Sequence, residues 1–298
     1  MKQLFFIFIL LMSAQIYSQT ENDKYAIFDA KGNRKSFEQL IEELGKSDVV
    51  FLGENHDDTV AHALQMQVFK SAFEKYGRER KVTLSLEMFE RDVQTTLNEY
   101  LSGLISEQHF LASSRPWGNY KTDYRPLVEF AKENKLEVIA ANAPRRYVNM
   151  VTRLGRESLE KLSPEAKRWL APLPYGEASA VYAAKFDALM GQMTDSSSPQ
   201  RHNPMLNSQS LWDATMAYWI SKNLKQHKKS LIVHLNGSFH TENRLGTVEH
   251  LLKYSPKIKI LVVTMRYVDD FKNFDKPEYK DLGDFVILTD AKQPRSQR

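Results

Sequence analysis

The chain contains the pattern Gly-x-x-His twice, each time directly after a short apolar run. Gly53 and His56 follow residues 49–52, and Gly237 and His240 follow the run that begins at Leu231. With 12 Gly and 8 His in 298 residues, chance alone predicts about 0.3 copies. A glycine allows a sharp turn or a close approach of the backbone, so each histidine is projected from a strand end. Histidines placed in this way are suited to proton transfer or to metal binding.

Other polar groups follow the ends of predicted strands. Glu54 lies inside the first motif. Glu87 follows the apolar run at 82–86, and Arg145 comes shortly after the apolar run at 137–141. An unpaired carboxylate is costly in apolar surroundings, which favours a site role for Glu87 over a chance position. We therefore predict Glu54, Glu87 and Arg145 as catalytic residues if the protein is an enzyme, and His56, His240 and Glu54 as ligands of a divalent ion such as zinc. Helix capping or hydrogen bonding in the core is the alternative for His56 and His240, and a structural ion pair is the alternative for Glu54 and Glu87.

The elements that must position these residues predict an α/β fold. Short, almost wholly apolar runs indicate strands that are buried on both faces, as in a parallel sheet. The expected strands are 48–52, 82–86, 137–141, 230–236, 259–264 and 285–288, and helical patterns cover 60–76, 124–134 and 247–254. Between the third and fourth strands, residues 145–229 contain only helical patterns. We expect a mostly parallel central sheet flanked by helices, with this helical insertion, in one domain of residues 19–298.

The insertion is rich in aromatic and methionine side chains. Tyr182, Phe186 and Met190 share one face of a predicted helix, Tyr175 precedes it, and His202 lies in the segment that follows. Such residues at helical spacing belong more often to a core than to a cofactor site. A flat apolar cofactor such as haem would nevertheless suit this surface, with a tyrosinate or histidine as its axial ligand.

Composition sets limits on the remaining possibilities. The formal net charge is +4 with interspersed charges, and no basic stretch with interleaved aromatics indicates nucleic-acid binding. The absence of cysteine excludes disulfides, thiolate metal ligands, a cysteine nucleophile and an acylated lipoprotein anchor. Residues 1–18 read as a signal peptide, with Lys2 before a short apolar run at 4–12. We therefore expect an exported, soluble periplasmic protein without a lipid anchor.

Taken together, several stretches resemble the ChaN family of haem-binding uptake proteins, within the wider Tiki/TraB superfamily. The resemblance covers about residues 46–268. It is carried by FLGENH at 51–56 with His62, the strand ending in Glu87, WGNYKTDY at 117–124, AANAPR at 140–145, the segment from Tyr182 to His202, QSLWDATMA at 209–217 and NGSFH at 236–240.

This resemblance implies haem binding in bacterial iron acquisition, through a tyrosine ligand and at the interface of a homodimer. Tyr182 is the first choice for that ligand, with His202, Tyr175 and Met190 as further cofactor-binding residues. The implied partners are haem and the receptor or transporter components that pass it on. Members that resemble metallopeptidases use paired Gly-x-x-His motifs and a glutamate, so a metal-dependent hydrolase built on His56, His240 and Glu54 or Glu87 is the alternative.

Overall fold

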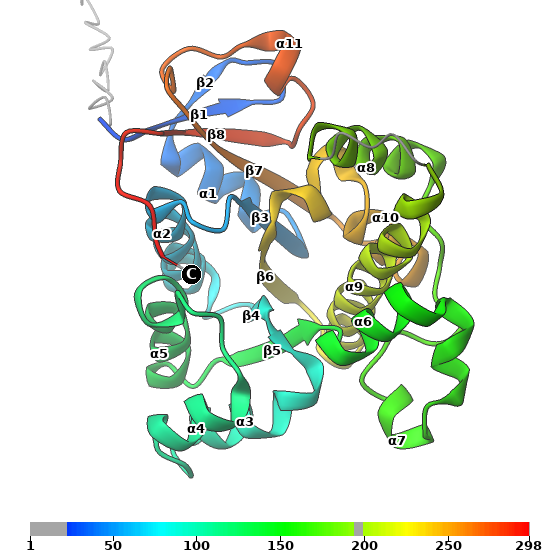
Figure 1. The fold of residues 1–298 in the computed structure, drawn as a ribbon. Helices are drawn as coiled ribbons and strands as arrows, with labels where there is room; N and C mark the ends of the chain where they lie inside the picture. Colours follow the sequence, from blue (N-terminus) through cyan, green and yellow to red (C-terminus); the bar gives the residue numbers. More distant parts are fainter. Residues whose placement is uncertain (1–22, 194–198, 298) are drawn as a thin grey trace, which may run out of the picture.

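The fold is built around one eight-stranded sheet, shown in Figure 1. The computed structural model describes residues 23–193 and 199–297. The strand order across the sheet is β2-β1-β8-β7-β3-β6-β4-β5. The strands are β1 Tyr25–Asp29, β2 Arg34–Lys35, β3 Val49–Glu54, β4 Lys81–Glu90, β5 Glu137–Asn142, β6 Ser230–Gly237, β7 Ile260–Val268 and β8 Phe285–Asp290. All neighbouring pairs from β8 to β5 are parallel, which confirms the predicted α/β class.

The six predicted strands are all present, and the two strands at one end of the sheet, β2 and β1, were not predicted. β1 pairs antiparallel with β8, and the two-residue β2 pairs antiparallel with β1. β2 is too short to give a periodic signal, and antiparallel strands of this kind need not read as continuous apolar runs. These two strands extend the sheet on the side away from both Gly-x-x-His motifs.

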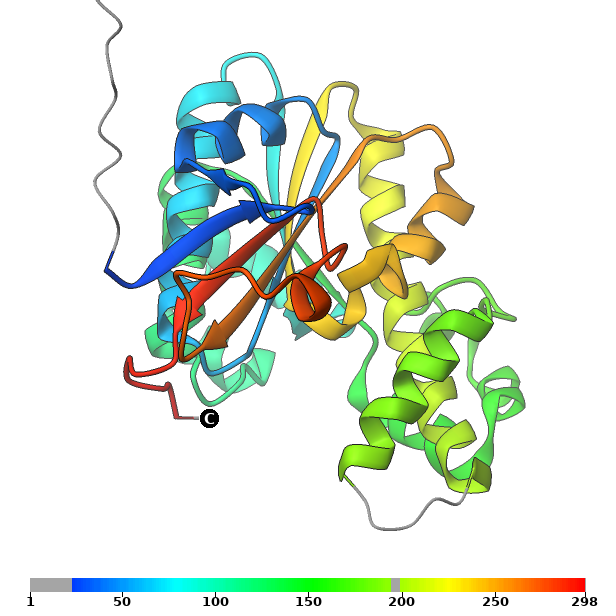
Figure 2. The ribbon, with the colours of Figure 1, turned by 90° about the horizontal axis from the view of Figure 1, so that it is seen from above.

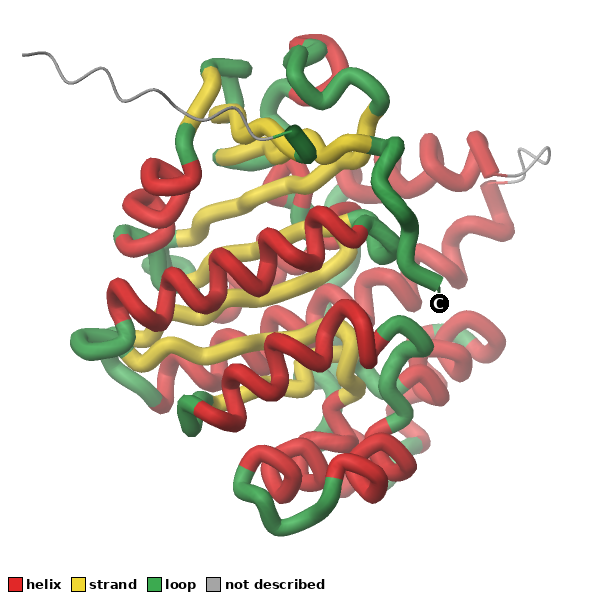
Figure 3. The backbone as a smooth tube through the Cα atoms, turned by 90° about the vertical axis from the view of Figure 1, so that its left-hand side faces the viewer, coloured by secondary structure: helices red, strands yellow, loops and turns green. Residues whose placement is uncertain are grey.

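Helices cover both faces of the sheet, so successive residues of a central strand enter different cores. Val50 and Leu52 of β3 pack in the core that also contains residues of α1, α2 and α5, whereas Val49 and Phe51 pack with residues of α9 and α10. Figure 3 shows the strands side by side with two helices lying along the near face. The helices of residues 23–193 and 199–297 are α1 Phe37–Gly45, α2 Thr59–Tyr76, α3 Gln94–Leu101, α4 Glu107–Ser114, α5 Arg125–Glu133, α6 Arg145–Leu154, α7 Pro164–Lys167, α8 Ala180–Met193, α9 Pro199–Gln226, α10 Thr247–Tyr254 and α11 Lys276–Tyr279.

The predicted helical insertion between β5 and β6 is confirmed in the part of it that the structure describes. Its helices α6 to α8 gather beside the sheet, as Figure 2 shows from above. The last helix of the insertion, α9, has a second role, because its Ala217 and Ile220 are fully buried against β3 and β6. The insertion therefore supplies part of the helical layer over the sheet, and it returns the chain to β6.

One sequence expectation falls outside these observations. The predicted signal peptide, residues 1–18, lies outside the described residues. Between residues 23 and 297, apart from 194–198, no helix combines the length and the apolar character that crossing a membrane requires.

Candidate functional site

The two Gly-x-x-His motifs lie next to each other because β3 and β6 are neighbouring parallel strands. In the pairing register, Gly53 lies opposite Asn236 and Glu54 lies opposite Gly237. A Cβ atom at Gly53 would come within 2.9 Å of the Ser238 Cα atom, so this glycine is required for the close approach of the two strand ends. The carboxyl ends of parallel strands are where such sheets place ligand sites.

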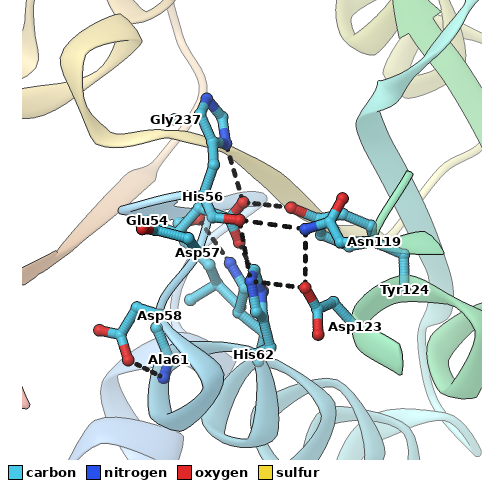
Figure 4. A network of polar contacts seen from close by, with 12 residues as sticks. Glu54, His56, Asp57, Asp58, Ala61, His62, Asn119, Asp123, Tyr124 and Gly237 are labelled. Atoms are coloured by element: carbon cyan, nitrogen blue, oxygen red, sulfur yellow. Dashed lines mark hydrogen bonds and ion pairs between the residues drawn. The ribbon is translucent and has the colours of Figure 1, made fainter. Parts of the chain in front are cut away.

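Glu54 is the centre of the first polar cluster, drawn in Figure 4. Its side chain is completely buried. The Tyr124 hydroxyl donates to Glu54 Oε1 at 2.6 Å, and His56 Nδ1 lies 2.9 Å from the same oxygen. His62 Nδ1 lies 3.1 Å from the other oxygen, Oε2. Burial raises the pKa of Glu54, but the contacts with His56 and His62 outweigh it and lower that pKa to about 2.

His62 is held as an imidazolium between two carboxylates. Its Nδ1 faces Glu54, and its Nε2 lies 3.3 Å from Asp123 Oδ2, so both ring nitrogens meet acceptors. Burial lowers the pKa of His62, but Glu54 and Asp123 outweigh it and raise that pKa to about 9. Asn119 completes this cluster, because its amide donates to Asp123 at 2.7 Å and to the carbonyl of His56 at 3.1 Å.

A second cluster surrounds His240 at the end of β6. His240 Nδ1 lies 2.7 Å from Asp213 Oδ1, and its Nε2 lies 3.7 Å from Glu87 Oε1. The Thr247 hydroxyl also donates to Asp213, at 2.7 Å, and the Gly237 N–H donates to Glu87 at 2.7 Å. Burial lowers the pKa of His240, but Glu87 and Asp213 outweigh it and raise that pKa to about 9.

Both clusters border one pocket of about 510 Å³. His56, Glu87 and His240 line it together, as the strand-end argument predicts. Arg145 also lines the pocket, but its side chain is 71% exposed and its Nε lies 3.9 Å from Glu90 Oε1. Arg145 is therefore at the rim, where it can contact an incoming ligand rather than the buried groups. The remaining lining residues are Glu90, Trp117, Asn142, Ala143, Val148, Asn149, Thr152, Gln209 and Trp212.

The structure does not gather the predicted zinc ligands around one point. Within residues 23–193 and 199–297, no group of three or more acidic or histidine side chains is arranged to hold a metal ion. Both oxygens of Glu54 face Tyr124, His56 and His62, whereas His240 lies in the other cluster. Metal binding by His56, His240 and Glu54 therefore stays a prediction that this arrangement does not favour.

The predicted haem-binding side chains lie in the insertion, and the two tyrosines among them are buried. Tyr182 is 1% exposed, and the Gln209 amide donates to its hydroxyl at 3.3 Å. Burial raises the pKa of Tyr182 well above its usual value of 10. The buried Tyr175 donates to the carbonyl of Asn207 at 2.9 Å. Met190 is half-buried on α8, and the His202 side chain lies outside the described residues. In this arrangement, neither tyrosine oxygen is accessible from the surface for binding to an iron.

Three side chains of the site escaped sequence reasoning. Asp123, Asp213 and His62 occur only in stretches that carry the family resemblance, and none of them is predicted as a site residue. Asp213 carried a usable signal, because it is the one carboxylate in the largely apolar helical segment 209–220. Asp123 lies in the π-helical turn Tyr120–Tyr124, whose register a regular helical pattern cannot reproduce.

Comparison with known proteins identifies the family. The family described as "Haem-binding uptake, Tiki superfamily, ChaN" matches residues 40–251, which is most of the chain. The chain belongs to this family. The match includes both Gly-x-x-His motifs and the whole insertion. ChaN of Campylobacter jejuni, whose solved structure is titled "Cofacial heme binding", has the same fold with a TM-score of 0.64 and 20% sequence identity. That similarity covers 91% of this chain and 98% of the Campylobacter chain.

A curated plant protein shows a more limited similarity. Protein RETICULATA-RELATED 5, chloroplastic, of Arabidopsis thaliana is 25% identical over 149 residues, or 48% of this chain. The match spans only 19% of that relative's own length. It therefore says nothing about this chain's ligand or location.

Proposed function

We propose that this protein is an exported haem-binding component of bacterial haem or iron uptake, which binds haem through the aromatic and methionine-rich insertion. The observation that carries the proposal is the family match over residues 40–251, because it includes this insertion as well as the sheet. Haem taken up in this way would pass from a receptor to transporter components. Following the family resemblance, we propose that two copies of the chain hold it between them.

Tyr182 remains our first choice for the axial ligand, although the structure sets a condition on it. Its ring extends from α8 and packs on Phe239, with a centroid distance of 5.4 Å. An iron could reach the Tyr182 oxygen only if α8 moved away from the end of β6. Burial raises the pKa of the free Tyr182 phenol. A bond to iron would stabilise the tyrosinate and so offset this effect. His202, Tyr175 and Met190 are the further residues that we propose to contact the cofactor.

A comparison of hemin titrations tests this assignment. We expect wild-type protein to give a saturable shift of the Soret band and a tyrosinate charge-transfer band. Tyr182→Phe should lose the charge-transfer band and weaken binding at least about tenfold, since a lost bond of about 1.4 kcal/mol or more has that effect. Tyr100→Phe is the matched control, because this tyrosine is also buried but bonds Glu129 on the other face of the sheet. An unchanged charge-transfer band in Tyr182→Phe would rule out this ligand and leave haem binding itself intact.

Export is tested separately, by expressing the full chain in a Gram-negative host. We expect the protein in the periplasmic fraction with the first 18 residues removed, because the short apolar run suits a signal peptide rather than a membrane span. Intact-mass measurement of the periplasmic protein gives the cleavage position. Recovery of the uncleaved chain from the cytoplasm alone would contradict an exported role.

A further inference from the structure

The helix α8 is seated on the end of β6 through one narrow face. Within residues 180–191, the part of the helix whose side chains the structure describes, only Tyr182 and Phe186 are buried. They are four residues apart, so their rings lie on the same face of the helix. Both rings contact Phe239 of the second Gly-x-x-His motif, with centroid distances of 5.4 and 6.2 Å. We call this arrangement of α8 on Phe239 the closed position.

Lys185 adds an ion pair to the same face. Its Nζ donates to the carbonyl of Phe239 at 3.1 Å and lies 2.8 Å from Glu242 Oε1. The same Nζ lies 4.2 Å from the centroid of the Phe239 ring. The Lys185 and Glu242 side chains are only 18% and 7% exposed, so solvent and salt screen this pair weakly.

Glu242 is held in place independently of α8. Its Oε2 accepts a hydrogen bond from Arg266 of β7, and Arg266 also donates to the Ser238 hydroxyl. Loss of the lysine would therefore leave Glu242 with a cationic partner, so no buried charge would remain unpaired. The carboxylate is fixed to the sheet, and Lys185 is the member of the pair that belongs to α8.

The closed position contains a recess for the Tyr182 hydroxyl. Gly246 has a φ of +54°, and a Cβ atom there would lie 3.0 Å from the Tyr182 hydroxyl oxygen. The Gln209 amide donates to the same oxygen from α9 at 3.3 Å. The contacts that seat α8 on Phe239 therefore also withdraw the Tyr182 oxygen from solvent.

We propose that the Lys185–Glu242 ion pair holds α8 closed in the haem-free protein, and that haem binds only after this pair separates. The proposal rests on the proposed function, because it concerns access to Tyr182. Residues 175–179, directly before α8, form no helix or strand, so no regular element before α8 fixes its position. A ligand that binds only the open form binds more weakly in proportion to the open fraction. Loss of the ion pair should therefore strengthen haem binding rather than weaken it.

Hydrogen exchange of the haem-free protein tests the first half of the proposal. Lys185→Met removes the charge but keeps a long side chain that can pack on Phe239. We expect amide exchange in residues 184–190 to be at least about tenfold faster than in wild type, as loss of one charged hydrogen bond predicts. Exchange in β6 should not change, which shows that the sheet is intact. Unchanged exchange in residues 184–190 would overturn the proposal.

Two further variants sharpen this experiment. Lys46→Met is the matched control, because Lys46 forms an exposed pair with Glu43, and it should leave exchange in α8 unchanged. Glu242→Gln should also speed exchange in α8. If Lys185 acts through Glu242, Lys185→Met should add little in the Glu242→Gln background. Fully independent effects of the two substitutions would overturn the ion pair as the contact that closes α8.

Stopped-flow mixing with hemin tests the second half of the proposal. We expect Lys185→Met to bind hemin at least about tenfold faster and more tightly than wild type, and Lys46→Met to match wild type. Equal binding rates in wild type and Lys185→Met, despite faster exchange in α8, would overturn opening of α8 as the required step. Absence of saturable hemin binding in every variant would contradict the proposed function and this second half together. The exchange experiment would still decide whether the ion pair closes α8.

Discussion

Glu54→Gln is expected to destabilise the folded protein by about 3–5 kcal/mol, the usual effect of removing one partner from a buried ionic cluster. Glu54 is fully buried and is the carboxylate that both His56 and His62 face. Glutamine has nearly the same shape, so the expected effect comes from the lost charge rather than from a cavity. The free energy of unfolding, measured by urea titration near neutral pH, gives the magnitude.

An exposed carboxylate provides the matched control for this experiment. Glu43 pairs with Lys46 at 2.6 Å, but the two side chains are 47% and 67% exposed. Glu43→Gln should therefore change the free energy of unfolding by less than about 1 kcal/mol. If Glu54→Gln were no more destabilising than Glu43→Gln, the buried network of Figure 4 would not be the main polar support of the strand ends.

The second large effect is a pH dependence that follows from two imidazolium groups. The folded-state pKa values of His62 and His240 are raised from 6.5 to about 9. Each group then stabilises the fold fully below pH 6.5 and loses this contribution as the pH rises toward 9. The contribution is about 3 kcal/mol for each histidine, at about 1.4 kcal/mol for each unit.

Substitutions of His62 and His240 separate their pH dependence of stability from that of the other titratable groups. His62→Gln should destabilise the protein about 3 kcal/mol more below pH 6.5 than at about pH 9, and His240→Gln should behave in the same way. Urea titrations of wild type and variants at both pH values provide the four free energies for each comparison. His109→Gln is the matched control and should show no such difference, because this histidine lies exposed on α4. A difference that stayed constant across this pH range would mean that the two histidines are not held protonated.

The central part of the fold could be predicted because its strands are buried on both faces. Such strands are apolar at nearly every position, as Val49, Val50, Phe51 and Leu52 show in β3. The edge of the sheet could not be predicted in the same way, because β2 contains only Arg34 and Lys35. The double role of α9 was also hidden, since a helical pattern does not indicate which layer the helix will join.

The sequence predicted the histidines at the strand ends, but not the carboxylates that pair with them from distant elements. The repeat of Gly-x-x-His correctly indicated two histidines at one sheet edge, because parallel neighbouring strands end together. Whether a carboxylate pairs with His56 or with His240 depends on packing. Asp213 reaches His240 from the insertion, and Asp123 reaches His62 from the turn before α5. The burial of Tyr182 is likewise a property of how α8 packs, which its aromatic pattern alone did not indicate.

Titration of the purified wild-type protein with hemin, followed by absorbance, tests the central claim most directly. Membership of the ChaN family predicts a saturable Soret shift with a defined stoichiometry, and size-exclusion chromatography of the saturated sample should show two chains for the proposed shared site. A spectrum that changes only in proportion to added hemin, as in buffer or with an unrelated protein, would contradict haem binding by this chain.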